Sequence, residues 1–209
     1  PDELVRATIG GPGAPPLAWP APPWAKLYRA DLLAARGARF APDIMYGEDA
    51  LFNLGLYASG ARCRFVAASV YRYRLRPGST TRSYDERFVE SNERYLRALE
   101  KILIDCGRYP RPVVTELVDA SFVRSVTLAA VRIAGLPRRG DRRAAIALTR
   151  RNAAFARRLA RVRRAPGASR LERFVYALTR RAGPGPATAL LRPALRLRPQ
   201  RRGDGWAVI

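Results

Sequence analysis

The spacing of apolar residues between positions 85 and 181 constrains the fold of this chain more than any other feature. Apolar side chains recur there every three or four residues, which is the period of an amphipathic helix, and glycines and prolines interrupt them. The spacing predicts helices over 85–107, 113–134, 142–164 and 169–181. Prolines at 184, 186 and 193 are expected to break up the chain beyond them. The second half of the chain should therefore be helical.

The first 84 residues give a mixed pattern. Short helices are expected over 29–36 and 48–59, each followed by a glycine that favours a helix end. Two short strands are expected over 62–66 and 69–75. The uncharged run 7–25 holds six prolines and three glycines, so it reads as a loop rather than a membrane span. No other stretch is long and apolar enough to predict a transmembrane helix.

Positive charge is concentrated in the second half. Residues 1–107 carry 15 basic and 12 acidic side chains, whereas residues 108–209 carry 24 basic and 5 acidic ones. Basic amphipathic helices are attracted to anionic lipid surfaces. Nucleic acid is a weaker expectation, because aromatic residues are sparse among the arginines and no binding motif is present. A solvated face, or contact with another domain, stays open as the third interpretation.

The residue types present limit the chemistry. The chain has no histidine, which excludes Ser-His and Cys-His dyads and imidazole bases within these residues. Acid–base work would therefore fall to carboxylates. The two cysteines, Cys63 and Cys106, are expected to be small buried side chains rather than a disulfide or metal ligands.

Four short motifs follow one another between Pro23 and Thr81. They are Pro-Trp-Ala-Lys-Leu-Tyr-Arg at 23–29, Tyr-Gly-Glu-Asp with Phe-Asn at 46–53, Tyr-Arg-Tyr-Arg at 71–74, and Arg-Pro-Gly-Ser-Thr-Thr at 76–81. No single motif is specific. In this order and at these spacings, the series resembles the second half of the catalytic domain of family 2 glycosyltransferases. The resemblance covers less than a third of the chain.

The resemblance implies an α/β fold of the GT-A type for residues 1–108, as the acceptor-side part of the catalytic domain. A basic helical extension over 109–198 and a flexible tail over 199–209 are expected to follow, so that the chain as a whole is mainly helical. The most credible boundary is Tyr109-Pro110-Arg111-Pro112.

The implied reaction moves a sugar, with inversion, from a nucleotide-sugar donor to a hydroxyl of an envelope polysaccharide or a lipid-linked acceptor. The family holds Mg²⁺ or Mn²⁺ and the donor diphosphate with an Asp-x-Asp pair. No such pair occurs here, so the metal ligands and the donor-binding half are expected outside this chain. A cytoplasmic location, peripheral at the inner face of the cell membrane, fits such an enzyme.

Asp49 matches the position of the family's general base, with Glu48 as its neighbour. Acidic residues at a helix start also stabilise free amides and the helix dipole without any catalysis, which is the alternative interpretation. Trp24 and Lys26 match an element that lies beside the acceptor and the donor sugar, although Trp24 is equally suited to anchoring the proline-rich loop. Leu27 and Tyr28 are expected to pack in the core.

Arg74, Arg76 and Ser79 are candidates for holding a diphosphate, because guanidinium groups and loop amides bind phosphate oxygens well. A solvent-facing basic strand edge would give the same pattern. The competing interpretation of the whole chain is non-enzymatic, namely a basic helical module that binds an anionic membrane or nucleic acid.

Overall fold

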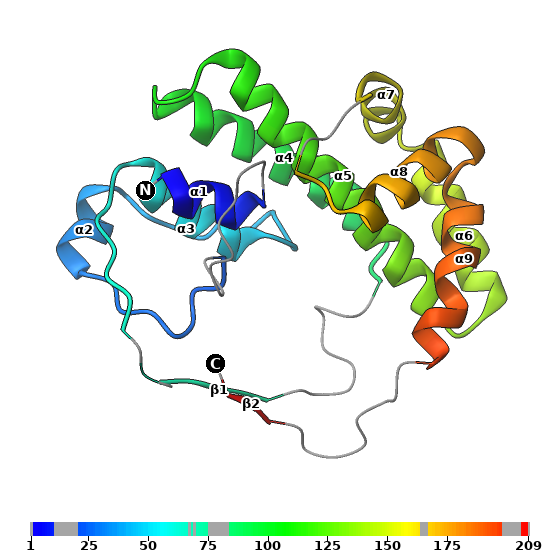
Figure 1. Cartoon of the computed structure of the whole chain (residues 1–209), viewed down its shortest axis with the longest axis horizontal. Coiled ribbons are helices and arrows are strands. Elements are labelled where there is room, and N and C mark those ends of the chain that lie inside the picture. Colours follow the sequence, from blue (N-terminus) through cyan, green and yellow to red (C-terminus); the bar gives the residue numbers. More distant parts are fainter. Residues whose placement is uncertain are drawn as a thin grey trace.

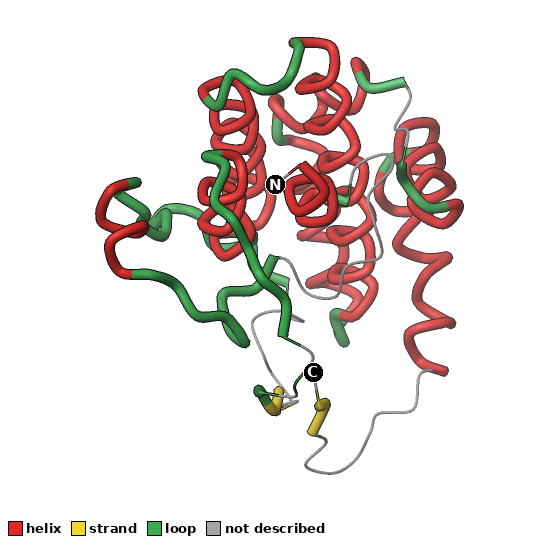
Figure 2. The backbone as a smooth tube through the Cα atoms, turned by 60° about the vertical axis from the view of Figure 1, so that its left-hand side comes forward, coloured by secondary structure: helices red, strands yellow, loops and turns green. Residues whose placement is uncertain are grey.

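The computed structural model describes residues 2–10, 21–66, 68, 70–74, 84–163, 167–197 and 206–208. Helices make up most of it (Figures 1 and 2). In chain order the elements are α1 (Asp2–Ile9), α2 (Ala30–Ala35), α3 (Glu48–Ala58), β1 (Arg72–Arg74), α4 (Phe88–Asp105), α5 (Arg111–Gly135), α6 (Arg139–Arg151), α7 (Ala153–Arg161), α8 (Arg170–Ala182), α9 (Pro184–Leu197) and β2 (Trp206–Val208).

The long helix α5 lies at the centre of the fold. It begins directly after Pro110 and carries Pro112 in its first turn, where the missing N–H removes no helical hydrogen bond. Apolar residues occupy several of its faces, and Leu117, Phe122 and Val123 are completely buried. Helices α4, α8 and α9 pack around it (Figure 1). A long helix with apolar residues on several faces thus lies where neighbours cover it.

The amino-terminal helices complete the main core. α1 packs against α3 and α5, and it buries Leu4, Val5 and Ile9. The core contains side chains from Leu4 to Tyr176, so it joins residues on both sides of the predicted boundary at 109–112. The division into the ranges 1–108, 109–198 and 199–209 stays a prediction.

Local signals explain the short helices of the second half. The helix predicted over 142–164 is two helices, because Asn152 takes an extended conformation and its side chain accepts a hydrogen bond from Phe155 N. Ser169 and Glu172 form a capping box at the start of α8. The expectation that prolines interrupt the chain after residue 183 is wrong, since α9 begins at Pro184 and tolerates proline in its first turn.

The predicted α/β domain of the GT-A type is not seen. Within the described residues, the sheet consists of β1 and β2 alone, which pair antiparallel with Arg72 opposite Val208. The strand predicted over 62–66 has no regular structure, and its Phe65 and Val66 are exposed. Strand-forming residues need a neighbouring strand and a covered face. The described chain buries its apolar residues between helices instead.

None of the helices in the described ranges combines the length and the apolar character that crossing a lipid bilayer would require.

Candidate functional site

The start of α3 positions the two predicted catalytic carboxylates. Gly47 precedes the helix with φ +89°, and a Cβ atom there would lie 2.7 Å from the ring of Tyr95. Glycine is therefore required for the tight turn that leads into the helix. Asp49 Oδ1 accepts a hydrogen bond from Ala50 N at 2.7 Å. Burial raises the pKa of Glu48.

Asn53 holds the preceding loop against α3. Its side chain is completely buried. Its Nδ2 donates to Ala21 O at 2.7 Å and to Asp49 O at 3.2 Å, and its Oδ1 accepts from Tyr28 Oη at 2.8 Å. A buried amide with all its polar atoms paired fixes the groups around it. The loop over 21–28 is thereby connected to the turn of α3 that carries Asp49.

The charge of Lys26 lies within electrostatic range of Asp49. Lys26 Nζ donates to Pro22 O. Burial lowers the pKa of Lys26, and the nearby negative charge of Asp49 opposes that shift. A half-buried ammonium group and a carboxylate of opposite charge thus influence each other near the start of α3.

Trp24 lies on the same loop as Lys26 and stacks on Tyr71. The ring centroids are 5.0 Å apart and the rings are 13° from parallel. Ala25, between Trp24 and Lys26, has φ +56°, a positive value that no other non-glycine residue of the described ranges shows. Such a conformation costs an L-residue about 1–2 kcal/mol. The Trp24–Tyr71 stack and the hydrogen bond from Asn53 to Ala21 O hold the loop that contains this turn.

The structure brings part of the predicted site together. Lys26 lies within electrostatic range of Asp49, Glu48 precedes Asp49 in the chain, and Trp24 lies in the loop that Asn53 holds. Arg74 lies in β1, but its side chain, and the whole of Arg76 and Ser79, lie outside the described residues. The predicted diphosphate clamp therefore stays a prediction.

Two expectations about packing are wrong. Leu27 is fully exposed rather than part of the core, whereas Tyr28 is half-buried and bonded to Asn53. Cys63 is exposed rather than buried, Cys106 is partly buried, and both are free thiols. Leu27 follows the turn at Ala25, whose φ is +56°, and its side chain is exposed to solvent.

Sequence reasoning did not assign a role to Asn53 or Tyr71. Asn53 stands four residues after Asp49, so both lie on one face of α3. This spacing is the feature of the sequence that could have indicated a role for Asn53 beside Asp49. Tyr71 meets Trp24 across 47 positions of sequence, a contact that no local pattern predicts.

A metal centre is not assigned. In the part of the chain that the structure describes, no group of three or more His, Cys, Asp or Glu side chains is arranged to hold a metal ion.

The site thus combines a carboxylate, an ammonium group within its electrostatic range and a stacked aromatic pair that joins Trp24 of the adjoining loop to Tyr71. Such an arrangement suits a neutral hydroxyl-bearing ligand, whose hydroxyl can bond the charged groups while its apolar face lies on an aromatic ring. Comparison of the chain with protein-family models, with curated proteins and with solved structures found no match.

Proposed function

We propose that this chain supplies the acceptor side of a glycosyl transfer, with Asp49 as the general base. One observation carries the proposal. Lys26 and Asp49, which stand in two of the four sequence motifs, lie close enough for the charge of one to shift the pKa of the other. Carboxylates that only stabilise the start of a helix need no loop fixed near them. Here the buried Asn53 bonds both Ala21 O of the loop that carries Lys26 and Asp49 O of α3.

The reaction needs two charge movements. The acceptor O–H bond breaks as its proton passes to the Asp49 carboxylate, and the acceptor oxygen attacks the anomeric carbon of the donor sugar. The bond from that carbon to the diphosphate breaks at the same time, and its electron pair leaves with the nucleoside diphosphate. A positioned carboxylate base contributes about 10²–10⁴-fold to such a step. Lys26 orients the hydroxyl and stabilises the negative charge that develops around it.

The donor is proposed to bind outside the 209 residues. The substrate classes proposed are a nucleotide sugar as donor and an envelope polysaccharide or lipid-linked sugar as acceptor. The proposed location is cytoplasmic, at the inner face of the membrane.

The test of the base is Asp49→Asn in the complete protein that contains these residues. Asparagine keeps the shape and hydrogen-bonding capacity at the helix start but removes the proton acceptor. We expect transfer of labelled sugar to fall by at least about 10²-fold, with helix content unchanged by far-UV circular dichroism. Glu48→Gln is the matched control and should reduce transfer much less. Transfer at near wild-type rate in Asp49→Asn would refute the assignment of the base.

A second measurement tests where the donor binds. Calorimetric titration of the 209-residue chain with UDP-, GDP- or CDP-linked sugars, in the presence of Mg²⁺ or Mn²⁺, should give no appreciable binding. Micromolar affinity for any of them would place the nucleotide site within these residues and contradict the proposal.

A specific observation also favours peripheral membrane binding as a second function. Leu171 and Phe174 are more than half exposed on one side of α8, and the exposed arginines Arg170 and Arg173 flank them. Apolar side chains bordered by cationic ones match the interface of an anionic bilayer. Vesicles of phosphatidylglycerol should therefore bind the chain, and vesicles of phosphatidylcholine should not.

The apolar contribution can be separated from the charge. Phe174→Ser should weaken vesicle binding by about fivefold, since burying half a phenyl ring contributes on the order of 1 kcal/mol. Equal binding to anionic and neutral vesicles would contradict the electrostatic part. Tighter binding to DNA or RNA than to vesicles would favour nucleic acid as the partner.

A further inference from the structure

A cavity of about 740 Å³ lies between α6 and α9, away from the carboxylates of α3. Its lining includes Arg139, Arg142 and Arg143 from α6 and Arg192 from α9. Among the lining residues that the structure describes, none carries a carboxylate. Small-molecule sites in proteins commonly have volumes of roughly 300–1,000 Å³. The size therefore suits an organic ligand rather than a lone ion.

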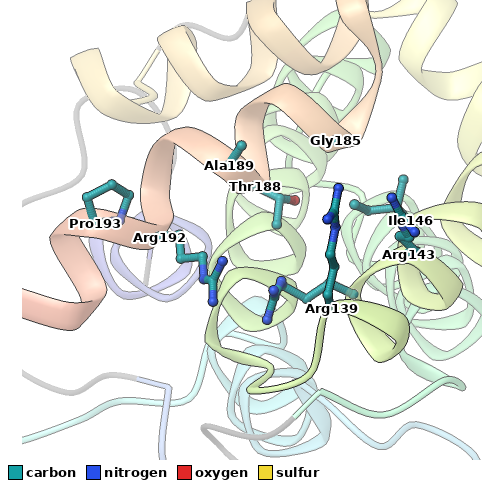
Figure 3. Close-up of a pocket in the computed structure, with 9 residues that line it drawn as sticks. Arg139, Arg143, Ile146, Gly185, Thr188, Ala189, Arg192 and Pro193 are labelled. Atoms are coloured by element: carbon teal, nitrogen blue, oxygen red, sulfur yellow. The ribbon is translucent and has the colours of Figure 1, made fainter.

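The arginines converge on one space. Arg139 reaches from α6 and Arg192 from α9 toward each other across the cavity (Figure 3). Within the described ranges, Arg139 and Arg143 form no ion pair with an acidic side chain. Asp141 stands in the same turn of α6 but does not line the cavity. Like charges repel, so an anion placed near Arg139 and Arg143 lowers the repulsion between their guanidinium groups.

Arg142 has a structural role that holds this arrangement. It is buried, and its Nη1 donates to Leu136 O and to Pro137 O. These bonds attach the start of α6 to the end of α5. These bonds hold the cavity wall on the α6 side before any ligand arrives, and a preformed site binds at a lower entropy cost.

The remaining lining is apolar or weakly polar. Ile146, Ala189 and Pro193 provide hydrocarbon surface, and Thr188 gives its hydroxyl proton to Pro184 O, so that its oxygen still has acceptor capacity. The cavity thus offers a cationic part and an apolar part side by side. A phosphate or diphosphate ester with an attached organic group has the matching two-part chemistry.

We infer that the cavity between α6 and α9 is a binding site for an organic phosphate, whose phosphoryl oxygens lie between Arg139, Arg143 and Arg192. The inference is independent of the glycosyl-transfer proposal, since no residue of one site belongs to the other. The phosphoryl group can come from a soluble phosphate ester or from a lipid headgroup.

The test combines two pocket variants with a charge-matched control. Arg139→Gln with Arg192→Gln removes one guanidinium from each helix, and Ala189→Glu puts a carboxylate at an exposed position of the cavity wall. Arg151→Gln with Arg181→Gln removes the same charge from exposed positions outside the cavity. The 209-residue chain is titrated with pyrophosphate by calorimetry, and separately sedimented with vesicles containing phosphatidic acid or only phosphatidylcholine.

We expect wild type to bind pyrophosphate or phosphatidic acid vesicles saturably, and both pocket variants to weaken that binding by about tenfold or more. For pyrophosphate the control should stay within about twofold of wild type, because exposed charges at a distance are screened by salt, and for the vesicles it should lose less affinity than the pocket variants. If the pocket variants lose affinity for pyrophosphate alone, the ligand is a soluble phosphate ester. If they lose affinity for phosphatidic acid vesicles alone, the ligand is a lipid headgroup. The inference is overturned if wild type binds neither probe, or if the control loses as much affinity as the pocket variants.

Discussion

Asn53→Ala should loosen the loop that carries Trp24 and Lys26. The substitution removes the partner of two groups, Ala21 O and the Tyr28 hydroxyl. A buried polar group left without a partner costs about 1–3 kcal/mol. Both groups are only partly buried, and Tyr28 has Pro23 O at 3.3 Å as a second acceptor, so the lower end applies to each. We therefore expect a loss of about 2–3 kcal/mol in the free energy of unfolding.

The assay must separate loosening of the loop from general destabilisation. In a background with Trp19→Phe and Trp206→Phe, Trp24 is the single tryptophan. Urea unfolding followed by circular dichroism measures stability, and acrylamide quenching of Trp24 in the native state reports whether the loop is attached. Asn152→Ala is the control, since it removes the cap of α7 at a cost of about 1 kcal/mol and should leave Trp24 quenching unchanged.

Asn53→Asp adds a pH dependence whose sign can be worked out. A carboxyl group at this fully buried position has a raised folded-state pKa, because burial disfavours its charged form. Below the unfolded-state pKa of about 4 it is protonated in both states and can imitate the amide, so the variant should be close to wild type. As pH rises above that value, its stability should fall by up to about 1.4 kcal/mol per pH unit until the folded-state pKa is reached. If the difference in unfolding free energy between Asn53→Asp and wild type stayed the same from pH 4 to pH 7, the reasoning would be refuted.

Three further substitutions test other parts of the fold by urea unfolding. Gly47→Ala should cost at least about 2 kcal/mol, because φ is +89° and the new Cβ would lie 2.7 Å from the Tyr95 ring; a smaller loss would contradict the tight turn. Ala25→Gly should change the free energy of unfolding by less than about 0.5 kcal/mol, because glycine adopts the positive φ without strain but also gains freedom in the unfolded chain. A loss above about 1 kcal/mol would argue against the positive φ at this residue. Tyr176→Phe should cost about 1 kcal/mol by removing a 2.8 Å bond to Val162 O, whereas no loss would mean that the bond contributes nothing.

Helix positions could be predicted from the sequence where the signal is local. The helix expected over 48–59 is α3, which begins at Glu48 because glycine precedes it. The helices expected over 113–134 and 169–181 are α5 and α8, displaced by one or two residues at each end. An apolar stripe and an adjacent cap or proline determine such helices with little help from the rest of the chain.

The helices that were missed depend on tertiary contacts. α1 has eight residues, too few to be stable alone, and its Leu4, Val5 and Ile9 are covered by other helices. α9 contains three prolines, which a local pattern reads as interruptions. Two of them fall in the first turn, and Ala187 and Leu191 pack into a second small core with α5 and α8. Burial against neighbours outweighs the low helix propensity of proline here.

The site was predictable in part for the same reason. The motifs nominated Trp24, Lys26, Glu48 and Asp49 from their order alone, and the structure places the first two on one loop and the last two at the start of α3, while their roles stay predictions. The contact of Trp24 with Tyr71 joins segments that no local pattern relates. The prediction of an α/β fold was wrong, and it rested on the resemblance alone. In the described ranges Phe65 and Val66 are exposed, and no strand pairs with residues 62–66.

The described arginines of the second half fall into two groups, those that contact groups within the protein and those that do not. Several arginines are held by groups of the protein itself, including carboxylates, carbonyl oxygens and aromatic rings: Arg124, Arg132, Arg142, Arg158 and Arg161. Arg158, for example, reaches the buried Glu93 of α4 at 3.8 Å, and Arg132 lies over the Tyr46 ring at 3.9 Å. These contacts use the arginine as a packing element with a charged end.

The positive charge of the remaining arginines cannot be neutralised within the second half, because residues 108–209 contain only five acidic side chains and 24 basic ones. Charge of one sign at this density opposes the compact state. Added salt relieves the repulsion everywhere, whereas a phosphate ester between α6 and α9 would relieve it at one place and saturate with concentration. The cavity and the exposed face of α8 are therefore physically different uses of the same excess, the first selective for a ligand that fits and the second for any anionic surface.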